Sequence, residues 1–476
     1  MAILTVGSGQ QFATVNAAVH ASHDGDTIYV EAGTYVNDFS IIDTKISIIG
    51  VGGMAHFVAK ASPPNHKAIF VTNTDVTFDH VEFSGTKVAD KNGAGIKYQS
   101  GTLSITNSYF HDNQNGLLGS PYAGGTISID HSEFAHNGAG DGYSHNIYVG
   151  KIASLDVTNS YLHDAVVGHE LKSRAAITTV VGNRIFDNNG SASYSIDLPN
   201  GGAATIENNI IQQGPHSQNP AMIRYSEGTA SPWPGSQLLI DGNTFVNQLN
   251  SASAYAVKNQ IITAEITGNH IFGLAPSKIV SGPNVQSGND FLSSAPALPT
   301  SHPWEASPWN SLVSGGDGSD LLSGSTNKDL MVDGAGADTL FGLEGSDQLL
   351  GGAGNDLLTG GPGADTLTGD IGADRFIFNQ PGDFASGSTP DVITDFNHSE
   401  GDRIDLSGVD ANAKLSASQA FTFIGNQAFH NQPGELHYVT DGSSLIVEGD
   451  LNGDGHADFS FVVSGIAALT DSDFIL

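Results

Sequence analysis

The chain has 476 residues, with 50 acidic against 17 basic side chains and a formal net charge of −33. That charge repels nucleic acid and anionic membranes, so we expect neither as a partner, and no apolar run reaches the ~20 residues of a membrane span. The 59 glycines show no triplet period, which excludes collagen, and the absence of cysteine excludes disulfides as a source of stability.

The first residues predict a short helix followed by a strand. The segment FATVNAAVHASHDGDTIYVEAGTY, from Phe12 to Tyr35, has an amphipathic start, an Asp-Gly-Asp turn and then an alternating run. A helix at this place would cover the open end of a repeating β structure, whose strand edge is otherwise unpaired. No charged region followed by an apolar stretch is present, so we expect no Sec signal peptide.

A short apolar-polar pattern then recurs through the first 290 residues. It reads FDHVEF from Phe78, ITNSYF from Ile105, IDHSEF from Ile129, VTNSYL from Val157, VGNRIF from Val181, IENNII from Ile206, IDGNTF from Ile240 and ITGNHI from Ile266. The spacing lies in the mid-twenties for most units, the segments are rich in β-branched residues, and no helical period is visible. This pattern predicts one coil of a parallel β-solenoid per unit.

The opening helix and these repeats resemble the pectate-lyase-like superfamily of right-handed parallel β-helices. The resemblance covers roughly residues 1–290 and implies a right-handed parallel β-helix there. Many activities share such a fold, so the resemblance is informative for architecture and much less so for chemistry.

Each unit also predicts a strand that could form a working face. These strands are GIKY at 95–98, HNIYVG at 145–150, HELKS at 169–173, YSIDL at 194–198, MIRY at 222–225 and YAVKN at 255–259. Alternation of side chains predicts one outward row of Lys97, Tyr148, Lys172, Asp197, Arg224 and Lys258, a neighbouring row with Asn146, Glu170 and Ser195, and His145 and His169 at the strand starts. Four cations in one row of an acidic chain favour an anionic ligand; a surface ion-pair ladder of little energetic value is the alternative.

Acidic, uronate-containing polysaccharides suit this row as ligands. Lyases and C5-epimerases both remove a proton next to a carboxylate, which needs a base, charge neutralisation and a proton donor. We assign Lys172 as the base, because a desolvated lysine near other cations loses its proton readily, and Arg224 as the group that neutralises the carboxylate. Tyr148, His145 or His169 could supply the proton.

The run GHELKS followed by GNRIF resembles the alginate lyases and chondroitinase B of this fold. That resemblance implies that Asn146 and Glu170 hold a calcium ion that neutralises the uronate. Tyr194 stands where those families have an arginine, and Lys97, Tyr194 and Lys258 are further candidates for contact with the substrate. The YGFDPH signature of the epimerases is absent.

Three alternatives to a lyase stay open at this point. A C5-epimerase would use the same proton abstraction. A glycoside hydrolase could use Glu170 and Asp197, on adjacent coils, as an acid/base pair. A non-catalytic extracellular adhesin or matrix protein could bind polysaccharide along the same face.

Residues 291–312, rich in Pro, Ser and Ala, predict a linker, and a different repeat follows it. From Gly315 the chain reads GGDGSDLLS, GSTNKDLMV, DGAGADTLF, GLEGSDQLL, GGAGNDLLT, GGPGADTLT and GDIGADRFI, with an aspartate every nine residues. Glycine permits tight turns and aspartate supplies hard oxygen ligands, so the pattern predicts Ca²⁺ sites. The ligands would be Asp320, Asp338, Asp347, Asp356, Asp365 and Asp374, whereas Lys328 and missing glycines count against the unit with Asp329.

These nonapeptides resemble the repeats of RTX proteins, which implies a parallel calcium β-roll over residues 313–378. Residues 379–476 resemble the C-terminal region shared by serralysin-type proteases and secreted mannuronan C5-epimerases. That resemblance implies a β-rich secretion region, a type I secretion machinery as partner, and an extracellular protein. The segment DLNGDGHADF adds a possible calcium loop with Asp450, Asn452, Asp454 and Asp458, and no HExxH protease motif is present.

Overall fold

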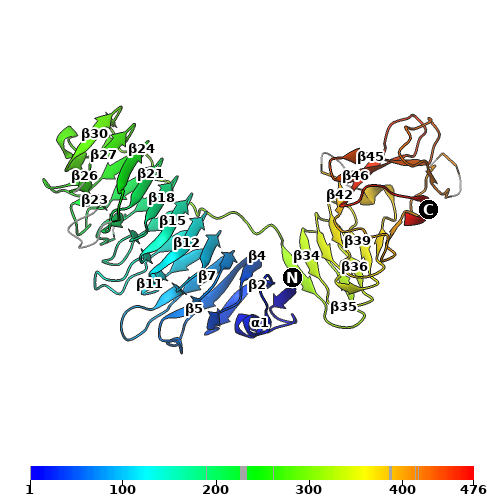
Figure 1. Cartoon of the computed structure of the whole chain (residues 1–476), viewed down its shortest axis with the longest axis horizontal. Helices are drawn as coiled ribbons and strands as arrows, with labels where there is room; N and C mark the ends of the chain where they lie inside the picture. The colour runs from blue at the N-terminus through cyan, green and yellow to red at the C-terminus, as the bar shows by residue number, and fades with distance from the viewer. Residues whose placement is uncertain are drawn as a thin grey trace. The chain divides into compact units, whose positions relative to one another are not determined.

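The computed structural model describes residues 2–188, 190–225, 233–260, 262–384, 389–412, 414–415 and 418–476. The chain forms two compact units: the first contains residues 1–7 and 12–306, and the second contains residues 8–11 and 307–476. No helix in these residues is long and apolar enough to cross a membrane. Both units are built from stacked parallel strands, as Figure 1 shows, so the predicted all-β architecture is confirmed.

The first unit is a parallel β-helix with three strands in a typical coil, and these strands stack into three faces. Face 1 contains β1 (Ile3–Val6), β2 (Thr27–Val36), β4 (Ile46–Val58), β6 (Val76–Asp79), β9 (Thr102–Thr106), β12 (Tyr122–Asp130), β15 (Ile152–Thr158), β18 (Ile177–Val181), β21 (Ala203–Glu207), β24 (Gln237–Asp241), β27 (Ala264–Thr267) and β30 (Asn284–Ser287). The long strands β2 and β4 continue into face 2 and join the two faces into one sheet.

Face 2 follows face 1 in each coil after a tight bend. It contains β7 (Val81–Ser84), β10 (Tyr109–His111), β13 (Glu133–Ala135), β16 (Tyr161–His163), β19 (Arg184–Phe186), β22 (Ile210–Gln213), β25 (Thr244–Asn247), β28 (His270–Phe272) and β31 (Asp290–Phe291).

Face 3 is a separate sheet that carries the candidate site. It contains β3 (Ser40–Ile42), β5 (Ala68–Thr72), β8 (Ala94–Tyr98), β11 (Asn115–Gly119), β14 (Ile147–Val149), β17 (Leu171–Ser173), β20 (Ile196–Leu198), β23 (Ala221–Tyr225), β26 (Tyr255–Asn259) and β29 (Val280–Ser281).

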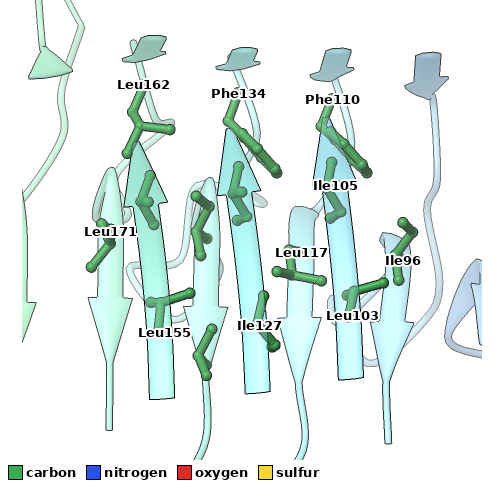
Figure 2. Close-up of a cluster of buried hydrophobic side chains, with 14 of the residues drawn as sticks. Ile96, Leu103, Ile105, Phe110, Leu117, Ile127, Phe134, Leu155, Leu162 and Leu171 are labelled. Atoms are coloured by element: carbon green, nitrogen blue, oxygen red, sulfur yellow. The ribbon is translucent and has the colours of Figure 1, made fainter. Parts of the chain in front are cut away.

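Columns of apolar side chains fill the inside of the coils. Face 3 contributes one column in register, which runs through Ile96, Leu117, Ile147, Leu171, Ile196, Ile223 and Val257. Leucines and isoleucines of face 1 and phenylalanines of face 2 meet this column from the other sides (Figure 2). All of these side chains are buried, so side-chain alternation along each strand sends the intervening residues of face 3 outward.

A second internal column is polar and lies at the bend between faces 1 and 2. The side chains of Asn183, Asn209, Asn243, Asn269 and Asn289 follow one another through hydrogen bonds of 2.8–3.0 Å from each amide nitrogen to the next amide oxygen. Each asparagine also donates to a backbone carbonyl of the coil before it. The column therefore satisfies the backbone at a buried bend, where water cannot.

The predicted N-terminal helix is α1 (Val15–Ala21), and its apolar side chains Val15, Ala18 and Val19 are buried. Its first turn is capped twice, because Thr14 accepts from the backbone N–H of Ala17 and Asp38 accepts from those of Val15 and Asn16. The chain past β31 continues in the first unit to residue 306 and contacts face 2: Arg184 donates to the Pro299 carbonyl, and His302 pairs with Glu133. One three-residue 3₁₀ helix, Pro276–Lys278, lies between β28 and β29.

The second unit has two facing columns of short strands. One sheet contains β32 (Ser311–Ser314), β34 (Asp329–Val332), β37 (Gln348–Leu350), β40 (Thr366–Thr368), β42 (Asp391–Ile393), β47 (Phe459–Ser464), β46 (Ser444–Asp450), β45 (Glu435–Asp441) and β44 (Thr422–Phe423). The other contains β33 (Leu321–Ser323), β36 (Thr339–Phe341), β39 (Leu357–Thr359), β41 (Arg375–Ile377), β43 (Arg403–Asp405) and β48 (Phe474–Ile475), and a small sheet pairs β35 (Ala335–Gly336) with β38 (Ala353–Gly354). Two 3₁₀ helices, Pro381–Asp383 and Asp471–Asp473, complete the unit.

Two repeats make one coil of this roll, so equivalent residues stack every 18 positions. The apolar residue two after each aspartate points inward, as in Leu340, Leu349, Leu358 and Leu367. Residues after 378 extend the same two sheets through β42 and β43, and an antiparallel pairing of β46 with β45 and β47 follows.

Candidate functional site

The outward row of face 3 has the order read from the sequence, with one insertion. Strand register places Lys97, Leu118, Tyr148, Lys172, Asp197, Arg224 and Lys258 side by side on successive strands. The sequence analysis did not include Leu118, because its strand β11 (NGLLG) is bounded by glycines and resembles a turn. Lys97 is therefore three strands from Lys172, about 14 Å at the spacing of paired strands.

Asp197 is the centre of the row and is fully buried. Its Oδ1 accepts from Arg224 Nε at 2.7 Å, and its Oδ2 accepts from Arg224 Nη2 at 2.8 Å. Lys172 Nζ and His169 Nε2 lie 3.3 and 3.2 Å from the same Oδ2. Burial alone would raise the pKa of Asp197, but the hydrogen bonds from His169 and Arg224 and the charge of Lys172 hold it well below the usual range.

Lys172 retains access to solvent, with 16% of its side chain exposed. Burial is the main cause of a lowered pKa, and the charges of Arg174 and Arg224 lower it further, whereas Asp197 opposes the shift. A lysine in this state has a larger neutral fraction near neutral pH than an exposed lysine, which a general base requires.

His145 and His169 stack in parallel beside this centre, with ring centroids 4.7 Å apart. The backbone N–H of His169 donates to His145 Nδ1, and that of Tyr194 donates to His169 Nδ1. Each ring therefore carries its proton on Nε2, and His169 directs that proton at Asp197. Burial lowers the pKa of both histidines, so they are neutral at neutral pH.

Arg174, two residues after Lys172, is a site residue that the sequence analysis missed. Its Nε donates to the Tyr148 hydroxyl at 3.2 Å and its Nη1 donates to Asn200 Oδ1 at 2.6 Å. In the part of the chain that the structure describes, no carboxylate forms a salt bridge with it, since its contacts are all to neutral groups. The side chains of His169, Lys172 and Arg224 thus contact the carboxylate of Asp197, and the charge of Arg174 acts on Lys172 beside them. The signal for Arg174 was its place in the run HELKSR, directly after the strand.

The remaining cations and Tyr194 flank the centre. Burial lowers the pKa of Lys97 to about 8, with a further contribution from the charge of Lys67. Lys258 follows Arg224 on the next strand, and the Arg224 guanidinium lies 4.8 Å from the centre of the Tyr194 ring. The row therefore extends on both sides of Lys172, as a groove for an elongated ligand would require.

Asn146 and Glu170 do not lie on this face, which corrects the predicted second outward row. Both are fully buried inside the coil, because the chain bends immediately before β14 and β17 and turns these residues inward. Asn146 presents its amide nitrogen to Glu170 and its oxygen to Asn137, and Glu170 accepts from the Ala165 N–H. Burial raises the pKa of Glu170 well above its usual value. Since the two oxygens do not converge, this pair does not fit a calcium ion, and neither side chain can touch a substrate.

The aspartates of the second unit form two ladders. In one, the backbone N–H of Asp320, Asp338, Asp356 and Asp374 donates to Oδ1 of the aspartate one coil later, ending at Asp402. In the other, Asp329, Asp347 and Asp365 do the same, ending at Asp391. Asp391 and Asp402 were not predicted as members, because the spacing there is 26 and 28 residues instead of 18.

The second carboxylate oxygen in these ladders has no protein partner at most positions. Oδ2 is buried and without a hydrogen bond in the ladder residues Asp338, Asp347, Asp356, Asp365 and Asp374, and also in Asp333, which lies outside the two ladders. Burial, with neighbouring carboxylates, raises the pKa of Asp347 and Asp374 to about 7 and that of Asp365 to about 8. Buried oxygens of this kind, stacked along glycine turns, fit Ca²⁺, which prefers hard oxygen ligands.

Two further positions refine the calcium assignment. Asp333, which was not predicted, forms a cluster with Asp320 and Asp338 whose ligand atoms lie within 4.8 Å of one another. Asp329 differs from its neighbours in the ladder, because one of its oxygens accepts from Ser325 N–H and the other from the Ser311 hydroxyl.

The loop from Asp450 to Asp458 is closed by its own hydrogen bonds. Asp450 accepts from the N–H groups of Asn452, Gly453 and Gly455, and Asp458 accepts from Leu451 N–H and the Asn452 amide. Asp454 accepts from His456 N–H. Calcium binding in this loop stays a prediction.

Comparison with known proteins identifies both repeat regions. A family model described as the RTX calcium-binding nonapeptide repeat matches residues 314–349 and 341–376, and a right-handed β-helix model matches residues 67–230. No curated protein matches the chain.

Several solved structures are similar. An alginate lyase from Paenibacillus sp. str. FPU-7 is 16% identical, with 60% of this chain and 99% of that chain covered and a TM-score of 0.43. A pectate lyase is 16% identical, with 60% and 78% covered and a TM-score of 0.36. A subunit of the Azotobacter vinelandii mannuronan C5-epimerase is 28% identical, with 34% and 80% covered and a TM-score of 0.19. The chain thus consists of a right-handed parallel β-helix followed by RTX calcium-binding repeats, as the sequence predicted.

Proposed function

We propose that face 3 binds an acidic, uronate-containing polysaccharide and cleaves it by β-elimination. One observation carries the proposal: Lys172 and Arg224 contact the buried carboxylate of Asp197, Arg174 adds a further positive charge beside Lys172, and Lys172 has a lowered pKa and remains accessible. In a chain of net charge −33, this local excess of positive charge needs an anionic partner.

Each residue of the site has one role in this reaction. Lys172 Nζ removes the C5 proton, the electron pair forms the C4–C5 double bond, and the bond from C4 to the glycosidic oxygen breaks. Arg174 replaces Arg224 as the group that stabilises the uronate charge, because Arg224 already binds Asp197 through two hydrogen bonds. The Tyr148 hydroxyl, held by Arg174, protonates the departing oxygen. Asp197 and His169 position Lys172, with which both are in contact.

The hydrolase alternative loses its acid/base pair, because Glu170 and Asp197 are both fully buried. An epimerase would use the same base and would return a proton to C5 without bond cleavage. A binding protein would need the charges of the row and none of the chemistry. The site therefore supports binding of a uronate more strongly than it supports elimination over epimerisation.

The RTX repeats support an extracellular location, with export through a type I secretion machinery. Calcium sites with many carboxylate ligands are filled where calcium is abundant, outside the cell. The lack of cysteine is compatible with this, because bound calcium can take the stabilising role of disulfides.

The test uses the calcium-saturated full chain and a panel of uronate polymers. We expect the ultraviolet absorbance of the new double bond to rise on at least one polymer, and Lys172→Ala to reduce the rate by at least about 100-fold. Lys87→Ala, which removes an exposed lysine of the same unit, is the matched control and should retain the rate. Deuterium incorporation at C5 without a rise in absorbance would indicate the epimerase, and binding without either change would indicate the adhesin.

A further inference from the structure

Face 2 carries a cluster of two histidines and a glutamate from three successive coils. His56 lies in β4, Glu82 in β7 and His111 in β10, and their ligand atoms all lie within 4.8 Å of one another. Glu82 Oε1 is 3.4 Å from His56 Nε2 and 2.9 Å from His111 Nε2. His56 Nε2 also lies 2.7 Å from the Ser84 hydroxyl.

These distances are close to those between ligands of a tetrahedral zinc ion. Two ligands at the usual ~2.05 Å from zinc are about 3.4 Å apart at a tetrahedral angle. The three side chains are between 18% and 26% exposed, so an ion can enter and water can complete its coordination. Two imidazoles with one carboxylate suit zinc and exclude a calcium site, since calcium takes oxygen ligands.

Asp112 provides a second and independent feature of a metal site. Its Oδ2 lies 2.7 Å from His111 Nδ1 and accepts that proton, which fixes the ring and leaves Nε2 to face Glu82 and His56. Histidines that bind metals commonly donate their other ring N–H to a carboxylate in this way.

A similar group two coils later shows what is special about the first. His163 contacts Glu133 and Asp164 at 3.2 and 2.8 Å, as His111 contacts Glu82 and Asp112. The strand position equivalent to His56 is occupied there by Tyr109, and the other oxygen of Glu133 binds His302. The second group therefore has no histidine at the position of His56, and His163 instead forms a separate cluster with His136 and Asp164.

We propose that His56, Glu82 and His111 bind one Zn²⁺ ion, with Asp112 orienting His111 and a water molecule in the fourth position. The ion would join three coils of the β-helix on face 2. This site is separate from the calcium ladders and from Lys172 on face 3, and it does not depend on the proposed lyase activity.

The experiment titrates the full chain with Co²⁺, and then Zn²⁺, in excess Ca²⁺ so that the RTX sites are filled. We expect one equivalent of Co²⁺ to produce visible d–d absorption that Zn²⁺ removes. His56→Ala and His111→Ala should each abolish this absorption, and Asp112→Asn should weaken Zn²⁺ binding by about 10- to 100-fold.

Two matched variants make the test decisive. His270→Ala removes another histidine that contacts an aspartate, and it should leave the titration unchanged. His131→Ala should also leave it unchanged, because His131 contacts Asp130 and belongs to no cluster of three ligands in the part of the chain that the structure describes. No d–d absorption in the wild type, absorption retained in both His56→Ala and His111→Ala, or loss in His131→Ala would overturn the proposal. Thermal melts confirm that each variant is folded.

Discussion

The two units use the same principle of stacked parallel coils and differ in how they satisfy their buried polar groups. In the β-helix, the asparagine column from Asn183 to Asn289 forms its hydrogen bonds within the protein. In the RTX unit, the equivalent column consists of aspartates, and each Oδ1 has a backbone donor while most Oδ2 atoms have none. An amide both donates and accepts, whereas a carboxylate only accepts, so a stack of aspartates requires an outside cation.

The largest expected effect of this difference is the response to a calcium chelator. We expect EGTA to unfold the RTX unit and to leave the β-helix intact, because uncompensated buried carboxylates are costly without a cation. Hydrogen exchange of the full chain, read separately for peptides of residues 1–306 and 307–476, measures this directly. Equal protection of both regions in EGTA would contradict the contrast.

In the absence of calcium, we expect protonation of the buried aspartates at low pH to stabilise the RTX unit in part. The pKa of Asp365 is raised to about 8 and those of Asp347 and Asp374 to about 7, against about 3.9 in an unfolded chain. The folded unit therefore holds protons more tightly than the unfolded one, so this stabilisation is complete below about pH 4 and is lost as the pH rises through 7 to 8. In EGTA we expect the melting temperature of the RTX unit to fall over this range.

With calcium present, we expect the melting temperature of the RTX unit to rise with pH over the same range, because the ion binds only deprotonated carboxylates. Thermal melts followed by circular dichroism, at several pH values with and without calcium, give both curves. Parallel curves under the two conditions would refute the role of these aspartates.

A smaller effect is expected from one rung of the asparagine column. Asn243→Ala removes hydrogen bonds to the Ile206 carbonyl and to Asn269, and it leaves the amide of Asn209 without its acceptor. We expect a loss of about 3 kcal/mol in the free energy of unfolding, since each unsatisfied buried group costs about 1–3 kcal/mol.

Urea unfolding of the calcium-saturated chain measures this loss. Gln286→Ala, at an exposed position of β30, should change the free energy by less than about 0.5 kcal/mol. Equal effects of the two substitutions would mean that the column is not a source of stability.

Much of the architecture follows from periodicity in the sequence. A unit of about 25 residues places one residue of each coil above the same residue of the next, so Lys172, Asp197 and Arg224 could be aligned without a structure. The nine-residue spacing of aspartates did the same for the calcium ladders. In both cases the length of the repeat determines which residues of successive coils lie next to one another.

The errors occur where the repeat is interrupted. Asn146 and Glu170 directly precede their strands, at a bend where side-chain alternation no longer holds, so both turn inward. Arg174 lies just past the end of β17, and its contact with Tyr148 depends on a side-chain conformation that no pattern encodes. Asp391 and Asp402 join the ladders across longer loops, which break the spacing.

Helix α1 has a consequence for how chains meet one another. A stack of coils ends in a row of free backbone N–H and C=O groups, onto which a neighbouring molecule could add its own layer and begin a filament. With Val15, Ala18 and Val19 buried and Asp38 fixing its first turn, α1 packs beside β1, β2 and β3 at the first coils of the β-helix. We therefore expect this seven-residue helix to hinder the addition of another layer at this end.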